Sequence, residues 1–119
     1  MCAPRGNLRN GEEILTDIDI VEELQRWYQK QCNGQWEHSY GVRIDTLDNP
    51  GWSVEIDLRG TELIGADLPP TRYERPDAWL HCEVVDGRFV ARCGPLQLRE
   101  ALRIFVELAN SIGDPTSMK

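Results

Sequence analysis

Residues 33–41, NGQWEHSYG, place six consecutive side chains that can hydrogen-bond, stack or titrate between two glycines. The arrangement closest to catalysis there is His38 beside Glu37, because a general base is commonly a histidine held by a carboxylate. The segment shows neither helical nor strand periodicity, and adjacent residues of an extended chain point to opposite sides. Glu37 and His38 are therefore not expected to form an acid–base pair. We predict a corner between a helix and a hairpin, with Trp36, Glu37 and Tyr40 available to a partner.

The four cysteines are the other candidates for chemistry, and they are scattered at Cys2, Cys32, Cys82 and Cys93. None forms a C-x-x-C pair or stands at metal-ligand spacing from a histidine, so we expect free thiols and no metal. None has the electropositive, helix-N-terminal setting that lowers a thiol pKa. The second histidine, His81, falls on the polar side of a predicted strand. With no phosphate loop and no G-x-S-x-G motif, the sequence predicts neither an enzyme nor a cofactor. A small thiol- or His-dependent enzyme, such as a sulfurtransferase, is the alternative.

Large aromatic side chains accompanied by carboxylates favour a binding protein. Trp and Tyr are enriched at the energetic centres of interfaces, and carboxylates suit a basic partner. For each tryptophan the alternative is packing in the core, which we expect for Trp27, whereas both readings stay open for Trp36. The predicted partner-binding residues are Trp36, Glu37, His38, Tyr40, Asp45, Asp48, Trp52, Glu55 and Asp57.

The charge of the chain narrows the class of partner. Its 119 residues include 20 acidic and 13 basic side chains, for a net charge of −7. Such a chain repels phosphate backbones, so we expect no nucleic acid and favour a basic protein; solubility alone is the other explanation. No apolar run is long enough to span a membrane, and the N-terminus lacks the apolar core of a secretory signal. We expect no membrane partner and a cytoplasmic location.

Two segments with helical periodicity begin and end the predicted domain. Residues 17–32 place Val21, Leu24, Trp27, Tyr28 and Cys32 on one stripe, with an aspartate as N-cap and Asn-Gly as the stop. Residues 96–112 place Leu98, Leu102, Phe105, Leu108 or Ala109, and Ile112 on another. We predict a loose lead-in over 1–16, a single domain over 17–113 and a frayed tail over 114–119.

Between the helices the periodicity changes to two, which predicts two β-hairpins. In the first, the apolar faces pair Ile44 with Ile56 and Val42 with Leu58 across a loop of residues 49–51. Gly51 would take the positive φ of that loop, although Pro50 leaves room for a longer loop of the same parity.

The second hairpin turns at Asp-Gly, residues 86–87, a strong two-residue turn signal. It pairs Val84 with Phe89 and Leu80 with Cys93, and we expect residues 61–78, with three prolines, to be an irregular connection. The predicted order is α-β-β-β-β-α: a two-layer α+β fold in which two terminal helices cover one face of a four-stranded antiparallel sheet. The open face would carry Arg43, Asp45, Ser53, Glu55, Asp57, Arg59, His81, Glu83 and Arg92.

Residues 27–58 resemble the immunity protein 53 family of bacterial polymorphic toxin systems. The matching pieces are Trp27-Tyr28, Cys32, Gly34, WEHSYG at 36–41, TLDNPGW at 46–52 and the alternating strand to Leu58. Further on, W-x-x-C at 79–82 and CGP at 93–95 before an amphipathic helix are also similar, so that the resemblance covers about residues 20–110.

The resemblance implies a small cytoplasmic protein that binds a toxin, usually one encoded beside it, and blocks its activity. It carries over no catalytic residues. The hypothesis is that an acidic surface with Trp or Tyr anchors covers a basic active-site cleft of the toxin, with the protein itself a monomer or a homodimer. The third reading is a homo-oligomeric interaction domain that pairs through an open sheet face or an edge strand.

Overall fold

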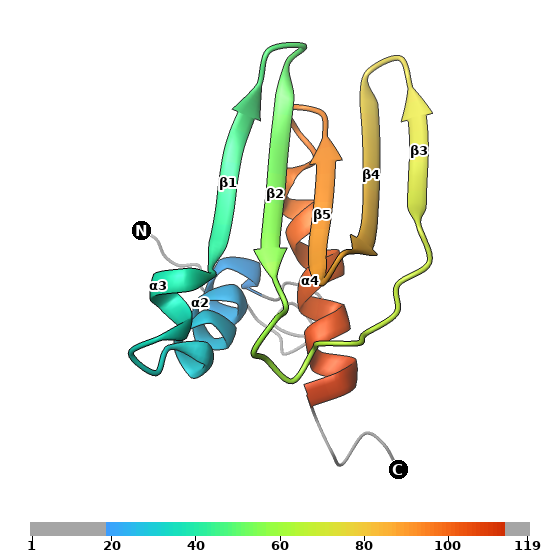
Figure 1. Ribbon diagram of the computed structural model, residues 1–119. Helices are drawn as coiled ribbons and strands as arrows, with labels where there is room; N and C mark the ends of the chain where they lie inside the picture. Colours follow the sequence, from blue (N-terminus) through green and yellow to red (C-terminus); the bar gives the residue numbers. More distant parts are fainter. Residues whose placement is uncertain (1–18, 114–119) are drawn as a thin grey trace, which may run out of the picture.

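The computed structural model describes residues 19–113 and has an α+β fold, with helices packed on one face of an antiparallel sheet (Figure 1). The predicted lead-in and tail lie outside the described residues. The elements are α2 (Ile20–Gln31), α3 (Trp36–Ser39), β1 (Val42–Leu47), β2 (Gly51–Asp57), β3 (Thr71–Arg75), β4 (Ala78–Val85), β5 (Arg88–Cys93) and α4 (Leu98–Gly113). In this range no helix has the length and apolar character needed to cross a membrane.

The sheet has five strands in the order β1-β2-β5-β4-β3, one more than the sequence predicts. The additional strand is β3, which lies in the connection expected to be irregular and pairs antiparallel with β4. Prolines bracket it at Pro70 and Pro76, and proline is compatible with an edge strand, whose outer N–H groups need no partner. The four predicted strands are all present.

The first hairpin differs from its predicted register. Val42 pairs with Ile56, and Ile44 pairs with Val54, so the predicted partners are wrong by two residues although the faces are right. The two strands are connected by residues 48–50. Gly51 is the first residue of β2, and its φ is not positive, contrary to the prediction. A Cβ on Gly51 would stand 2.1 Å from the carbonyl oxygen of Cys93. Glycine is required there by the close approach of β5, which no local pattern reveals.

The second hairpin has the predicted register. Val84 pairs with Phe89 and Leu80 with Cys93, and both turn residues have positive φ, 54° at Asp86 and 72° at Gly87. Two consecutive left-handed residues are the signature of the type I′ turn that Asp-Gly favours. The prediction is confirmed because its determinants are local.

The core lies between the sheet and α2 and α4, which Figure 1 shows behind one face of the strands. Helix α2 is rotated from its predicted orientation: Ile20, Trp27 and Gln31 are buried, whereas Val21 is 58% exposed and Tyr28 40% exposed. The predicted aspartate N-cap of α2 is Asp19, whose side chain accepts a hydrogen bond from the N–H of Glu22. On α4 the predicted stripe holds for Leu102, Phe105, Leu108 and Ala109.

Trp27 fixes α2 to the rest of the fold. Its ring meets Phe105 of α4 edge-on at 4.9 Å between centroids, and its Nε1–H donates to the Glu62 carboxylate at 3.0 Å. The side-chain amide of Gln31 donates to the same carboxylate at 3.2 Å. Gln31 is a buried residue of α2, and this bond gives its amide a hydrogen-bond partner. The loop after β2 is thereby tied to α2, next to the segment 33–41.

Candidate functional site

The segment 33–41 is a rigid corner built on the single helical turn α3. The side-chain oxygen of Asn33 accepts from the N–H groups of Gln35 and Trp36, at 2.9 and 3.0 Å. The Glu37 carboxylate accepts from the N–H groups of Asn33 and Gly34, at 2.9 and 2.7 Å. Hydrogen bonding from its own backbone N–H, reinforced by those two donors, lowers the pKa of Glu37. Glu37 is therefore a stabilising cap as well as a surface carboxylate.

Trp36 belongs to the core. Its side chain is 4% exposed, and its Nε1–H donates to the carbonyl of Arg59 at 2.8 Å. Its ring packs against Trp27, Tyr28 and Tyr40 at centroid distances of 5.9, 6.0 and 6.5 Å. The prediction left packing and partner contact open for Trp36, and burial decides for packing.

A polar hollow of about 210 Å³ lies beside this corner, where α3 meets the first hairpin. Asp57 is held in it by Arg59, whose Nε and Nη2 donate to the carboxylate at 2.9 and 2.7 Å, while Arg88 stands 3.9 Å away. The hydrogen bond from Arg59 holds the pKa of Asp57 below its usual range. Arg59 also lies over the ring of Tyr40, 5.0 Å from its centroid, a cation–π geometry. The hollow is lined by Ser39, Tyr40, Gly41, Val42, Arg43, Glu55, Asp57, Arg59 and Arg88.

The predicted partner-binding residues do not form one surface. Tyr40, Glu55 and Asp57 line the hollow, and exposed His38 and half-buried Glu37 stand on the adjacent α3 turn. Asp45 lies further along the open sheet face, paired with Ser53. Two members lie at the other end of the first hairpin: Asp48 is in its turn, and Trp52 donates from Nε1 to the Pro95 carbonyl at 3.0 Å.

The charge of this region is mixed, because arginines stand among the carboxylates of the predicted binding surface. Arg43, Arg59 and Arg88 line the same hollow as Glu55 and Asp57. Asp57 is the last residue of β2 and Arg59 follows it by two residues, so the pattern Asp-x-Arg was the available sign of this pairing. The hollow therefore carries three arginines against two carboxylates, so the net negative charge of the chain is not concentrated there.

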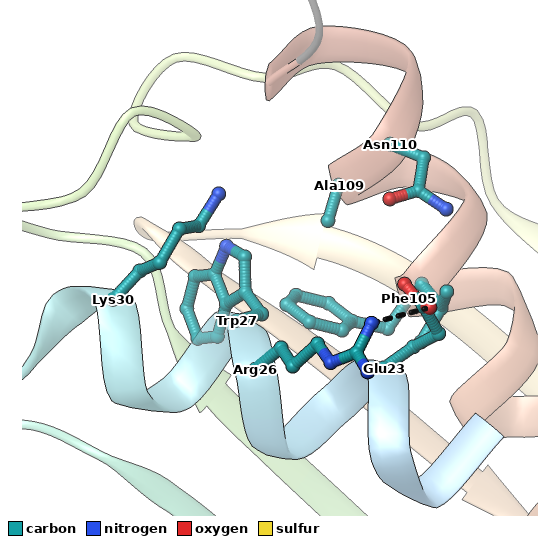
Figure 2. Close-up of a pocket in the computed structure, with 8 residues that line it drawn as sticks. Glu23, Arg26, Trp27, Lys30, Phe105, Ala109 and Asn110 are labelled. Atoms are coloured by element: carbon teal, nitrogen blue, oxygen red, sulfur yellow. Dashed lines mark ion pairs between the residues drawn. The ribbon is translucent and has the colours of Figure 1, made fainter. Parts of the chain in front are cut away.

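A second hollow, which the sequence did not indicate, lies between α2 and α4 (Figure 2). Its volume is about 280 Å³, its floor includes Trp27, Phe105 and Ala109, and charged side chains stand at its rim. Figure 2 shows Arg26 reaching to Glu23, 4.0 Å between Nη1 and the carboxylate. Two amphipathic helices that meet along their apolar stripes leave such a groove where small residues such as Ala109 face large ones.

The two buried cysteines considered for catalysis have environments that suit packing. Cys82 and Cys93 are buried free thiols, and burial raises both pKa values, that of Cys82 to about 12. A thiol with so high a pKa holds no thiolate at neutral pH. His81 lies 3.0 Å from the Glu74 carboxylate on an open part of the sheet. Across the described part of the chain, no three His, Cys, Asp or Glu residues are grouped so that they could hold a metal ion.

Comparison with known proteins adds one match. The model of a family described as "Immunity protein 53" matches residues 21–110, which is most of the chain. No curated protein and no solved structure matches it.

Proposed function

Since this chain belongs to the immunity protein 53 family, we propose that it binds a cognate toxin of a bacterial polymorphic toxin system and neutralises it in the cytoplasm. The observation that carries the proposal is the family match over residues 21–110. The buried, high-pKa thiols support an inhibitor that acts by binding. The protein encoded by the gene next to its own is the candidate toxin.

The proposed toxin-binding surface is the corner surface, defined as His38, Tyr40, Glu55, Asp57 and Arg59. Several features support it: it is hollowed, it presents an aromatic ring at its edge, and its charges are held in place before any partner arrives. Fixed charges lower the entropy cost of binding, because fewer side chains must be ordered at the interface. The side chains of Asn33 and Glu37 cap α3 and hold its backbone in place, which lowers the entropy cost of binding in the same way.

The proposed mechanism is occlusion of the toxin's active site. Tyr40 is 37% exposed and stacked on Arg59, the kind of aromatic–arginine pair that commonly forms the energetic centre of an interface. The carboxylate of Glu55 would meet a basic group of the toxin, while buried Asp57 holds Arg59 in place to meet an acidic one. The overall charge of −7 steers a basic toxin toward the protein without fixing where it docks.

Calorimetry with the neighbouring gene product tests the proposal in two steps. Binding of the unaltered protein with a Kd in the nanomolar range is expected; no heat and no co-elution would refute the function. In the second step, Tyr40→Ala should weaken binding by about 2 kcal/mol, roughly 30-fold in Kd, as loss of a hot-spot residue does. The control is Asp48→Ala, in the turn at the far end of the first hairpin, with unchanged affinity expected. If both variants bind as the unaltered protein does, the function stands and the corner surface is wrong.

A further inference from the structure

Strand β1 is an edge of the sheet with one open side. Within residues 19–113 it pairs with β2 alone, and its six residues, Val42–Leu47, are exposed or half-buried throughout. An open edge is a template for pairing with another strand, and proteins usually block it with proline, with charged side chains, especially lysine, or with a bulge. The other edge, β3, has prolines on both sides, whereas β1 contains neither proline nor lysine.

The hydrogen bonds of the sheet identify the backbone groups that point outward from β1. The N–H of Asp57 donates to the carbonyl of Gly41 at 3.0 Å, while the N–H of Leu58 donates to Gly87 on the other side of β2 at 2.9 Å. Backbone groups alternate in direction along a strand. With the observed register, the odd-numbered residues of β1 face β2, and Val42, Ile44 and Thr46 direct their N–H and C=O groups to the open side.

We propose that two copies of this chain associate through β1, antiparallel about a twofold axis at Ile44. Each Ile44 then exchanges two backbone hydrogen bonds with the partner's Ile44, and Val42 pairs with the partner's Thr46. These are the residues whose backbone groups point outward, so the pairing uses every free donor and acceptor of the strand's centre. Two five-stranded sheets become one continuous sheet, an isologous contact in which both copies use the same surface.

The charges of β1 select this register. About an axis at Ile44, Arg43 stands opposite the partner's Asp45, and Asp45 opposite the partner's Arg43, on the open face of the sheet. Shifting the axis by one residue places Arg43 opposite itself or Asp45 opposite itself, and like charges directly opposite each other are destabilising. Of the three alignments with the axis at residue 43, 44 or 45, the strand sequence VRIDTL is thus self-complementary only in the one centred on Ile44.

The exposed apolar side chain at the centre agrees with this pairing. Ile44 lies on the helix-facing side of the sheet but is 39% exposed, because α4 packs against β4 and β5 and leaves β1 uncovered (Figure 1). In the proposed dimer the two Ile44 side chains lie side by side across the axis and shield each other from water. This association requires no toxin, so it can be tested whether or not the proposed function holds.

Sedimentation equilibrium of charge-reversed variants tests the proposal. The unaltered protein should show twice the mass of one 13.6-kDa chain. Arg43→Asp and Asp45→Arg should each sediment as monomers, because each places two like pairs across the axis. An equimolar mixture of the two variants should recover the dimer mass, because both cross-axis pairs are then of opposite sign. Misfolding cannot produce that recovery.

Two further variants separate the edge of β1 from other contacts. Ile44→Pro removes an outward N–H and keeps the hydrogen bonds to β2, so it should give a folded monomer by circular dichroism. Arg72→Asp, on the other edge, should leave the dimer unchanged. The proposal is overturned if the unaltered protein is a monomer, or if the charge variants dimerise singly. It also fails if their mixture stays monomeric. If the unaltered protein is a monomer and Ile44→Pro loses toxin binding, the edge of β1 pairs with a strand of the toxin instead.

Discussion

Replacing Trp36 by phenylalanine tests whether the corner at residues 33–41 is held by the core. The substitution removes the hydrogen bond from Nε1 to the Arg59 carbonyl, 2.8 Å long, which is worth about 1 kcal/mol net. The smaller ring also leaves space beside Trp27 and Tyr40, at about 1–2 kcal/mol for the two buried carbons that are lost. The free energy of unfolding should therefore fall by about 2–3 kcal/mol, or about 10 °C in Tm for a domain of this size.

The matched control is Trp52→Phe, the same chemical change at a tryptophan that also donates to a backbone carbonyl. Its bond to Pro95, 3.0 Å long, is open to solvent, so water can replace the lost donor. The expected loss is below about 1 kcal/mol. Urea titrations followed by circular dichroism, which does not depend on tryptophan emission, give both values. If Trp36→Phe costs no more than Trp52→Phe, the assignment of Trp36 to the core is refuted.

The same variant also distinguishes packing from recognition. Because Trp36 is 4% exposed, folded Trp36→Phe should bind the toxin with an affinity close to that of the unaltered protein. A large loss of affinity with little loss of stability would instead mean that the tryptophan is presented to the partner.

Three other predictions concern single contacts. Gly51→Ala should destabilise the protein by about 2 kcal/mol or more, because its Cβ would lie 2.1 Å from the Cys93 carbonyl; a urea midpoint within error of the original would contradict this. Asp57, whose pKa is lowered by Arg59, should contribute stability that is complete above its ordinary pKa of about 4 and is lost as pH falls through the lower folded value. The stability difference between the unaltered protein and Asp57→Asn should then shrink below about pH 4, and a difference constant with pH would rule the linkage out. Cys82, with its pKa raised to about 12 by burial, should react with a thiol reagent at pH 8 only after unfolding; rapid labelling of the native protein would disprove its burial.

Features that depend on neighbouring residues could be predicted from the sequence. Helix α4 follows from its apolar period, and the hairpin of β4 and β5 follows from alternation around Asp86-Gly87. Family membership was also readable, because the motifs at 36–41 and 46–52 are contiguous in the chain. In each case the physical cause lies within a few residues of its effect, so that no knowledge of the fold is needed.

The predicted site was the feature hardest to derive from the sequence. Its nine residues lie on several elements, and only the fold shows which of them are neighbours. Alternation places Asp45, Glu55 and Asp57 correctly on one face, but it does not show that arginines share the hollow with them. Trp36 has the same local sequence whether it faces a partner or the core. Its burial follows from how α3 lies against Trp27, which comes from a separate helix.

Local pattern thus fixed which strand residues share a face, that a turn forms at Asp86-Gly87 and which family the chain joins. The offset of the first hairpin depended instead on the contact of Gly51 with Cys93, more than forty residues later in the chain. The strand β3 likewise exists because β4 offers it an edge, since its own sequence is short and bounded by proline. Such outcomes need the assembled sheet, because shifts of two residues keep every apolar side chain on the buried face and only distant packing tells them apart.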